Sequence, residues 1–158
     1  TPDGDITTPG AENHAWAIIN MKDTKVGGSA QTTAAIDVMF TPFAGLRIGG
    51  GYTYYGRNYA FYSLSGSSLK LGKEMFVANP WEIPSYGCLD LRASYQLDLG
   101  KNKLTFFCHM NNALDTTYIE KAWNPSNVSS SRNDVDPAGV YMFYGLGRNW
   151  NTGVKYNF

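Results

Sequence analysis

Apolar and polar residues alternate along four stretches of the chain, at residues 30–41, 46–57, 86–97 and 104–113. A period of two is typical of a strand with one apolar and one polar face. With Val154 near the end of the chain, the apolar set comprises Ile36, Val38, Phe40, Leu46, Ile48, Leu89, Leu91, Leu104, Phe106 and Val154. The opposite set carries Asp37, Arg47, Asp90, Arg92, His109 and Lys155. The pattern predicts an all-β chain with antiparallel strands, apolar on one side of the sheet and charged on the other.

Two further strands are predicted outside these stretches, a short one at residues 15–21 and a long one at residues 141–158. Tight turns that contain Gly join the four alternating strands in pairs. Polar segments at residues 56–85 and 115–140 separate the pairs and are predicted to be long loops. Short turns and long loops are therefore predicted to alternate along the chain.

That alternation of turns and loops is typical of outer-membrane barrels, whose tight turns lie on the periplasmic side and whose long loops lie outside. The predicted strands match the ~9–11 residues that cross a bilayer at a tilt. Of these six predicted strands four to five are long enough to span, and they cannot close a barrel, because spanning barrels begin at about eight strands. An open sheet edge in hydrocarbon leaves backbone groups without partners. We therefore expect residues 1–158 to be the C-terminal part of a larger transmembrane barrel, with both sheet edges paired to more protein.

Composition gives no support to a nucleic-acid-binding protein but does not decide between a membrane barrel and a soluble sandwich. Lys plus Arg and Asp plus Glu both number 13, so the net charge is zero and gives no electrostatic case for nucleic acid. The 11 Tyr, 8 Phe, 4 Trp and 17 Gly, with 16% charged residues, suit a twisted sheet with interfacial aromatic rings. A soluble aromatic-rich sandwich has the same composition. The first residues lack a signal-peptide pattern, so we expect a mature form or an N-terminus that lies elsewhere.

Three segments resemble TonB-dependent outer-membrane receptors. Residues 110–118, Met-Asn-Asn-Ala-Leu-Asp-Thr-Thr-Tyr, resemble the late-barrel motif V-N-N-L-F-D-x-x-Y of that family, with Ala113-Leu114 where the family commonly has Leu-Phe. Residues 84–95 are similar to the strand that precedes this motif. Residues 145–158, G-L-G-R-N-W-N-T-G-V-K-Y-N-F, resemble the closing strand. The three segments occur in the expected order over roughly residues 30–158.

The resemblance implies a parent barrel of about 22 strands with a plug domain. It implies uptake of a scarce nutrient of the glycan, peptide, siderophore or cobalamin type, energised by TonB through an N-terminal part that is absent here. The run Tyr144–Trp150 resembles the SusC-like branch, which works with a SusD-like surface lipoprotein. The expected partners are the remainder of the receptor, the lipid bilayer, TonB and such a lipoprotein, in the outer membrane of a Gram-negative bacterium. No cofactor is expected.

Aromatic residues in or beside the long loops are the candidates for contacting a substrate or partner: Tyr59, Phe61, Tyr62, Trp81, Trp123 and Tyr141. The alternative is self-packing of the loops on the barrel rim, with Tyr52, Tyr54 and Tyr55 as an outer aromatic girdle. The charged set named above is expected to line the lumen. His14 and His109 have no partner at a metal-ligand spacing, and no residue spacing argues for catalysis. We therefore expect neither a metal site nor an enzyme.

Pairing the strands at residues 86–97 and 104–113 about their turn places Arg92 opposite His109 and Ala93 opposite Cys108. Cys88 and Cys108 then lie on opposite faces, so both are expected to be free thiols. The run Gly49–Gly51 lies within a strand and predicts sheet curvature or the close approach of the plug domain.

The chain ends on an alternating strand whose Thr152, Val154, Tyr156 and Phe158 share one face. An outward aromatic at the membrane interface is expected where a final strand seals a barrel. Trp150, Tyr156 and Phe158 are therefore predicted to close the barrel, with Trp150 deeper in the bilayer. Transport is the leading hypothesis. A passive or adhesive outer-membrane barrel and a soluble carbohydrate-binding β-sandwich remain the alternatives.

Overall fold

The computed structural model describes residues 18–62, 74–124, 128–129 and 137–158, and within them the chain is all-β. The strands are β1 (Ile18–Asn20), β2 (Ala30–Phe43), β3 (Leu46–Tyr59), β4 (Phe61–Tyr62), β5 (Glu74–Val77), β6 (Glu82–Ile83), β7 (Tyr86–Leu99), β8 (Asn102–Asn111), β9 (Ile119–Asn124), β10 (Val128–Ser129), β11 (Tyr141–Tyr144) and β12 (Asn149–Asn157). A short 3-10 turn covers Pro137–Gly139. The chain divides into two compact units. Residues 30–58, 83–121 and 143–158 form the large-sheet unit, and the other described residues form the small-sheet unit.

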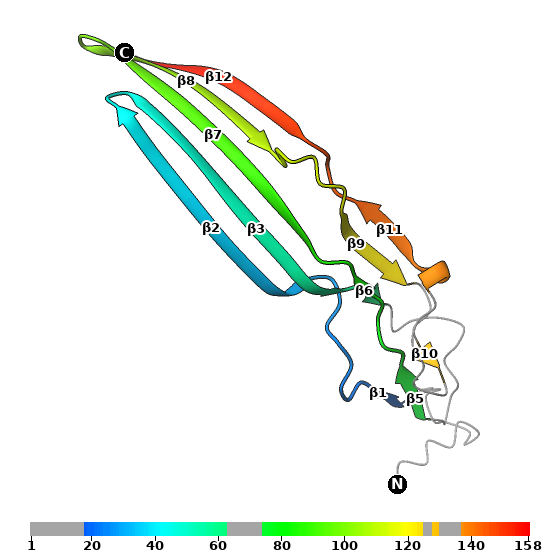
Figure 1. Cartoon of the computed structure of the whole chain (residues 1–158). Helices are drawn as coiled ribbons and strands as arrows, with labels where there is room; N and C mark the ends of the chain where they lie inside the picture. Colours follow the sequence, from blue (N-terminus) through cyan, green and yellow to red (C-terminus); the bar gives the residue numbers. More distant parts are fainter. Residues whose placement is uncertain (1–17, 63–73, 125–127, 130–136) are drawn as a thin grey trace, which may run out of the picture. The chain divides into compact units, whose positions relative to one another are not determined.

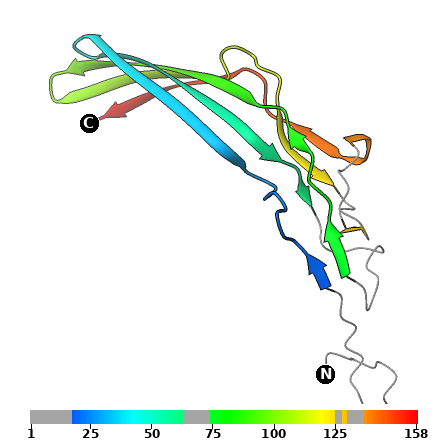
Figure 2. The ribbon, with the colours of Figure 1, turned by 60° about the horizontal axis from the view of Figure 1, so that its bottom comes forward.

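The large sheet has the antiparallel order β12-β8-β7-β3-β2, with β6 added to β3 (Figure 1). Arg92 pairs with His109 and Ala93 with Cys108, so the register predicted from the sequence is confirmed. The β2–β3 turn, the β7–β8 turn and the C-terminus lie at one end of this sheet, as both ribbon views show (Figures 1 and 2). Strands β2 and β12 are its two edges.

The apolar face of this sheet is uncovered. The exposed fractions are 65% for Ile36, 60% for Val38, 63% for Phe40 and 60% for Val154. Ile48, Leu91 and Phe106 are exposed too, whereas Leu46, Leu89 and Leu104 are half-buried among their neighbours. A sheet that forms a core in water covers such a face, whereas these side chains are left exposed.

The two turns are tighter than the sequence pattern predicts. Strands β2 and β7 continue to Phe43 and Leu99, which leaves two-residue connections that contain Gly45 and Gly100. Both glycines have positive φ, 89° and 73°, which a two-residue hairpin turn requires and which glycine adopts without strain. Pro42 is accommodated because the β2–β3 register shifts between Phe40 and Phe43, on the sheet edge.

The prediction of one long strand at residues 141–158 is wrong, because residues 145–148 separate two strands, β11 and β12. The predicted loops at residues 56–85 and 115–140 also contain strands. They hold β4, β5 and β6 in one case and β9 and β10 in the other. These strands are two to six residues long, too short to show a period in the sequence. Part of the strand predicted at residues 15–21 lies outside the described residues, and β1 accounts for the rest.

The small-sheet unit carries the densely packed core. Met75 and Val77 of β5 are buried, as are Ala60 and Ala122. Strand β5 lies between β1, its parallel neighbour, and β10, its antiparallel neighbour. A second short sheet has the order β11-β9-β4. Met75, Val77 and the two alanines fill this core, whereas the aromatic rings of Phe61, Trp123 and Tyr141 are left exposed.

Candidate functional site

The motif at residues 110–118 folds into a clasp that holds the β11–β12 connection. The clasp consists of Asn112, Asp115, Tyr118, Gly145 and Arg148. Asn112 is 3% exposed and has a left-handed φ of 50°, a region that asparagine tolerates better than most residues. Its Nδ2 donates to the carbonyls of Thr116 (2.9 Å) and Leu146 (3.2 Å), and its Oδ1 accepts from the Thr116 N–H (2.9 Å).

Two further contacts complete the clasp. Asp115 Oδ1 accepts from the Arg148 N–H at 2.8 Å, and the Gly145 N–H donates to the Tyr118 carbonyl at 3.0 Å. The Tyr118 ring lies so close over Gly145 that a Cβ there would be 2.1 Å from Tyr118 Cζ. These contacts satisfy backbone groups that a continuous strand would otherwise pair, which explains the interruption at residues 145–148.

Replacing Gly145 by Ala is therefore expected to lower the free energy of unfolding by about 1–3 kcal/mol, because the new methyl group must displace the Tyr118 ring. Urea unfolding followed by fluorescence measures the change. Gly139→Ala is the matched control, since nothing lies within 4 Å of a Cβ at Gly139. Equal stabilities of the two variants would show that packing of the Tyr118 ring on Gly145 does not stabilise the connection between β11 and β12.

Three tyrosine rings form a ladder on the polar face beside the clasp. Tyr55 stacks on Tyr86 with ring centroids 5.0 Å apart, and Tyr86 stacks on Tyr118 at 4.3 Å. Strand alternation brings Tyr55 and Tyr86 to the polar face, where they are register partners. The prediction that Tyr55 joins an outer girdle is wrong for that reason. Tyr52 and Tyr54 do lie on the apolar face, with exposed fractions of 40% and 39%.

The tyrosine ladder and the clasp border an open pocket of about 590 Å³ on the polar face. The pocket combines the three aromatic rings with two carboxylates, amide and hydroxyl groups. The lining residues are Thr53, Tyr55, Tyr86, Cys88, Asp90, Asn111, Asn112, Tyr118, Glu120, Leu146 and Asn149. Asp90 Oδ1 accepts the Asn112 N–H at 2.9 Å, and Asn111 Nδ2 donates to Asn149 Oδ1 at 2.8 Å. A concave site with an aromatic wall and convergent polar groups is typical of ligand binding.

Burial and nearby negative charge both act on the pKa of the Tyr118 phenol in this pocket. Burial raises the pKa of Tyr118, and the anionic forms of neighbouring acids, Glu120 and Asp90 among them, raise it further. The phenol therefore stays neutral and remains a hydrogen-bond donor throughout the physiological pH range.

The other charged residues of the polar face lie farther along the same sheet. Arg92 Nη2 donates to Asp37 Oδ1 across β3, which lies between their two strands. The bridge passes over Gly49 and Gly51, the register partners of Arg92 and Asp37, and a Cβ at Gly51 would be 2.9 Å from Asp37 Oδ2. The chain's own side chains thus approach the glycine run, and the approach of a plug domain stays a prediction.

The remaining predicted polar residues show no such pairing. His109 contacts the Phe107 ring at a centroid distance of 5.7 Å, and Arg47 and His109 line a small pocket of about 50 Å³. Lys155 is the register partner of Thr105 on the same face. The structure therefore brings all six predicted polar residues to one face but only Asp90 into the larger polar pocket.

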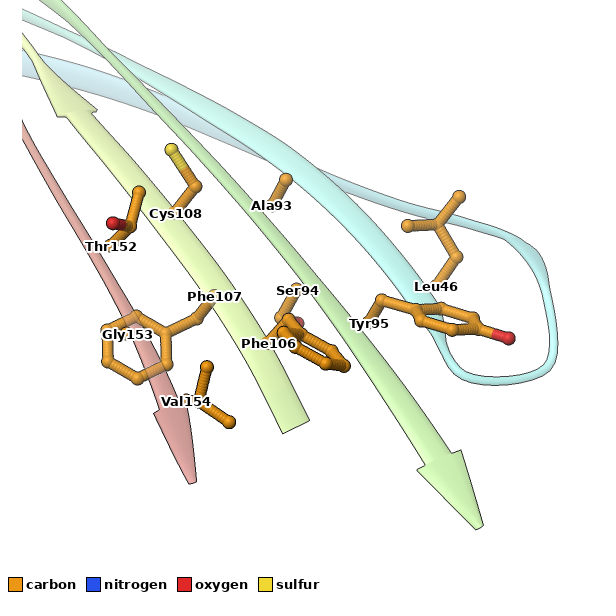
Figure 3. Close-up of a pocket in the computed structure, with 10 residues that line it drawn as sticks. All are labelled: Leu46, Ala93, Ser94, Tyr95, Phe106, Phe107, Cys108, Thr152, Gly153 and Val154. Carbon is orange, nitrogen blue, oxygen red and sulfur yellow. The ribbon is translucent and has the colours of Figure 1, made fainter. Parts of the chain in front are cut away.

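A second pocket, of about 600 Å³, lies on the large sheet (Figure 3). Its lining includes a row of small side chains, Ala93, Cys108 and Thr152, on three adjacent strands. Larger apolar side chains flank the row, including Tyr95 and Phe106. This pocket offers an apolar surface, and its lining residues include no Asp, Glu, His, Lys or Arg. Cys88 and Cys108 are free, as predicted.

The structure brings three of the six candidate loop aromatics together. Phe61 pairs with Trp123 between β4 and β9, and Trp123 stacks on Tyr141 of β11 at 5.7 Å. Their exposed fractions are 58%, 39% and 59%, so the three rings form an open aromatic row. Tyr62 stacks on Phe61, whereas Tyr59 and Trp81 contribute backbone carbonyls that bind Gly28 and Ala60.

The residues predicted to close a barrel lie on the apolar face of β12 or beyond its end. Trp150 is 66% exposed and is the register partner of Met110. The Tyr156 hydroxyl accepts a hydrogen bond from Asn102 Nδ2 at 2.7 Å, and the ring of Phe158, which is 99% exposed, lies 6.2 Å from that of Tyr156.

Among the described residues, no group of three or more His, Cys, Asp or Glu is arranged to hold a metal ion. In the same part of the chain, no helix has the length and apolarity needed to cross a membrane. Comparison with known proteins gives no match to a family model, a curated protein or a solved structure.

Several residues that shape the site were missed in the sequence. The roles of Tyr86, Tyr118 and Glu120 have no local signal, because nothing in the sequence shows that Tyr118 stacks on Tyr86 or that Glu120 lines the same pocket. Asn112 carried a signal, since two consecutive asparagines end an alternating strand just before Asp115 and two threonines. That arrangement is typical of side chains that bind nearby backbone.

Proposed function

We propose that this chain is the C-terminal wall segment of a TonB-dependent outer-membrane transporter that imports a scarce nutrient. The observation that carries the proposal is the uncovered apolar face of the large sheet, which continues across β2, β3, β7, β8 and β12. Monomers in water rarely leave continuous apolar surface beyond a few hundred Å². Lipid is the natural solvent for such a face, while the opposite, charged face suits an aqueous lumen.

The strand lengths and edges support the same proposal. Strands β2, β3 and β7 have 14 residues each, and β8 has 10, enough to cross a hydrocarbon layer. The outer edges of β2 and β12 present backbone groups that a bilayer cannot satisfy. Under the proposal, both edges pair with other strands of the same receptor. The resemblance at residues 84–95, 110–118 and 145–158 supports the assignment to the TonB-dependent class, with TonB and a SusD-like lipoprotein as partners.

Separation of inner and outer membranes from cells that make the complete protein tests the proposal. The protein is expected in the outer-membrane fraction, and detergent is expected to be required for its extraction. The complete sequence should also contain a plug domain and a TonB-binding segment. A plug-free sequence in the outer membrane would favour a passive or adhesive barrel. A monodisperse protein in buffer without detergent would favour the soluble sandwich and contradict the proposal.

A further inference from the structure

The polar-face pocket carries an unbalanced negative charge. Two of its lining residues, Asp90 and Glu120, are carboxylates, and none is Lys, Arg or His. Arg92, the nearest basic residue along β7, is bonded to Asp37 instead. A concave site with two anionic groups and no counterion among its walls attracts a cation from outside.

The two carboxylates differ in how firmly they are held. Asp90 is fixed because one oxygen accepts the N–H of the buried Asn112 at 2.9 Å. Glu120 contacts Lys121 only at 3.9 Å, and both side chains are more than half exposed. Such a surface pair contributes little, so the charge of Glu120 remains free to act on a ligand.

The tyrosine ladder that borders the pocket favours a planar cation that can stack on an aromatic ring. Tyr86 is covered on both faces by Tyr55 and Tyr118. Tyr118 also packs against Gly145, which leaves Tyr55 as the ring whose outer face a cation can meet. Tyrosine faces attract cations, and a planar guanidinium both stacks on an aromatic ring and binds a carboxylate through two parallel N–H groups. The hydroxyl and amide groups of Thr53, Asn111 and Asn149 supply further acceptors. The pocket volume of about 590 Å³ lies in the range of small-molecule sites.

We infer that this pocket binds the guanidinium group of a solute, with Asp90 and Glu120 as its anionic partners and the tyrosine ladder as its wall. That the solute is imported rests on the proposed transport function. The preference for a cation rests on the pocket alone. The sheet therefore contributes a specificity-determining site as well as a wall.

Argininamide and citrullinamide form the matched probe pair, because they have nearly the same shape but only the first carries a guanidinium. Saturation-transfer NMR titrations of the complete protein, in buffer or detergent as its solubility requires, give the dissociation constant of each. We expect argininamide to bind about tenfold more tightly than citrullinamide, the difference that one charge-assisted interaction makes. Equal binding, or no binding of argininamide, overturns the inference.

Two variants test whether the carboxylates of Asp90 and Glu120 bind the guanidinium group. Asp90→Asn keeps an oxygen for the Asn112 N–H, and Glu120→Gln changes an exposed side chain, so both are expected to fold. Each should weaken argininamide binding about tenfold, while Asp98→Asn, the same charge change at the turn end of β7, should not. An equal loss in Asp98→Asn would reveal a general charge effect and overturn the site. Membrane fractionation reports on the transport proposal separately, because the titration does not depend on where the protein resides.

Discussion

Asn112→Ala is expected to lower the free energy of unfolding by about 3–5 kcal/mol, since each buried polar group left without a partner costs ~1–3 kcal/mol. The side chain makes three hydrogen bonds, to the backbone of Thr116 and of Leu146. Alanine leaves these backbone groups unpaired and must adopt a φ of 50° that it disfavours. Urea titration of the folded protein measures the loss.

Asn111→Ala provides the matched control for this prediction. Asn111 directly precedes Asn112 in the chain, but its side chain is exposed and donates a hydrogen bond to Asn149 Oδ1. The expected loss is below about 1 kcal/mol, the usual effect of removing a surface polar contact. A similar loss in the two variants would mean that Asn112 acts as an ordinary polar residue and that the clasp is not what holds residues 145–148.

Val38→Arg is expected to prevent most of the complete protein from reaching its folded state in the outer membrane. Val38 is 60% exposed on the apolar face of β2, and an arginine facing lipid costs ~2–4 kcal/mol near the bilayer midplane. Quantitative detection of the protein in separated outer membranes measures the effect.

Ala35→Arg places the same charge on the opposite face of the same strand. Ala35 pairs with Thr53 on the polar face, where an aqueous lumen can hydrate a guanidinium. Its membrane level should stay close to that of the unchanged protein. If Val38→Arg assembled as well as Ala35→Arg, or made the protein more soluble, the apolar face would be a water-exposed surface and the proposed wall would be wrong.

The period-two pattern predicted what depends on local sequence. It placed Asp37 and Val38 on opposite faces, and it gave the Arg92–His109 pairing because a tight turn fixes hairpin register. The free state of Cys88 and Cys108 followed from the same register. These features need only strand alternation and a glycine-containing turn.

Features that depend on distant contacts were not predictable. The break at residues 145–148 exists because Asn112 binds the Leu146 carbonyl, 34 residues away. The tyrosine ladder joins three segments whose order in space is set by strand pairing, not by spacing along the chain. The aromatic row of Phe61, Trp123 and Tyr141 likewise requires the parallel pairing of β4 with β9, which the composition of these segments does not reveal.

Spin-label scanning of β2 tests the central claim, that the apolar face meets lipid and the charged face meets water. Nitroxides at Ile36, Asp37, Val38 and Met39, in a background without Cys88 and Cys108, are examined in the complete protein reconstituted in liposomes. The labels at Ile36 and Val38 should be accessible to oxygen, which concentrates in the bilayer, and protected from a water-soluble nickel chelate. Those at Asp37 and Met39 should show the reverse. Equal access of the chelate to all four positions, or failure of the protein to associate with liposomes, would contradict the account.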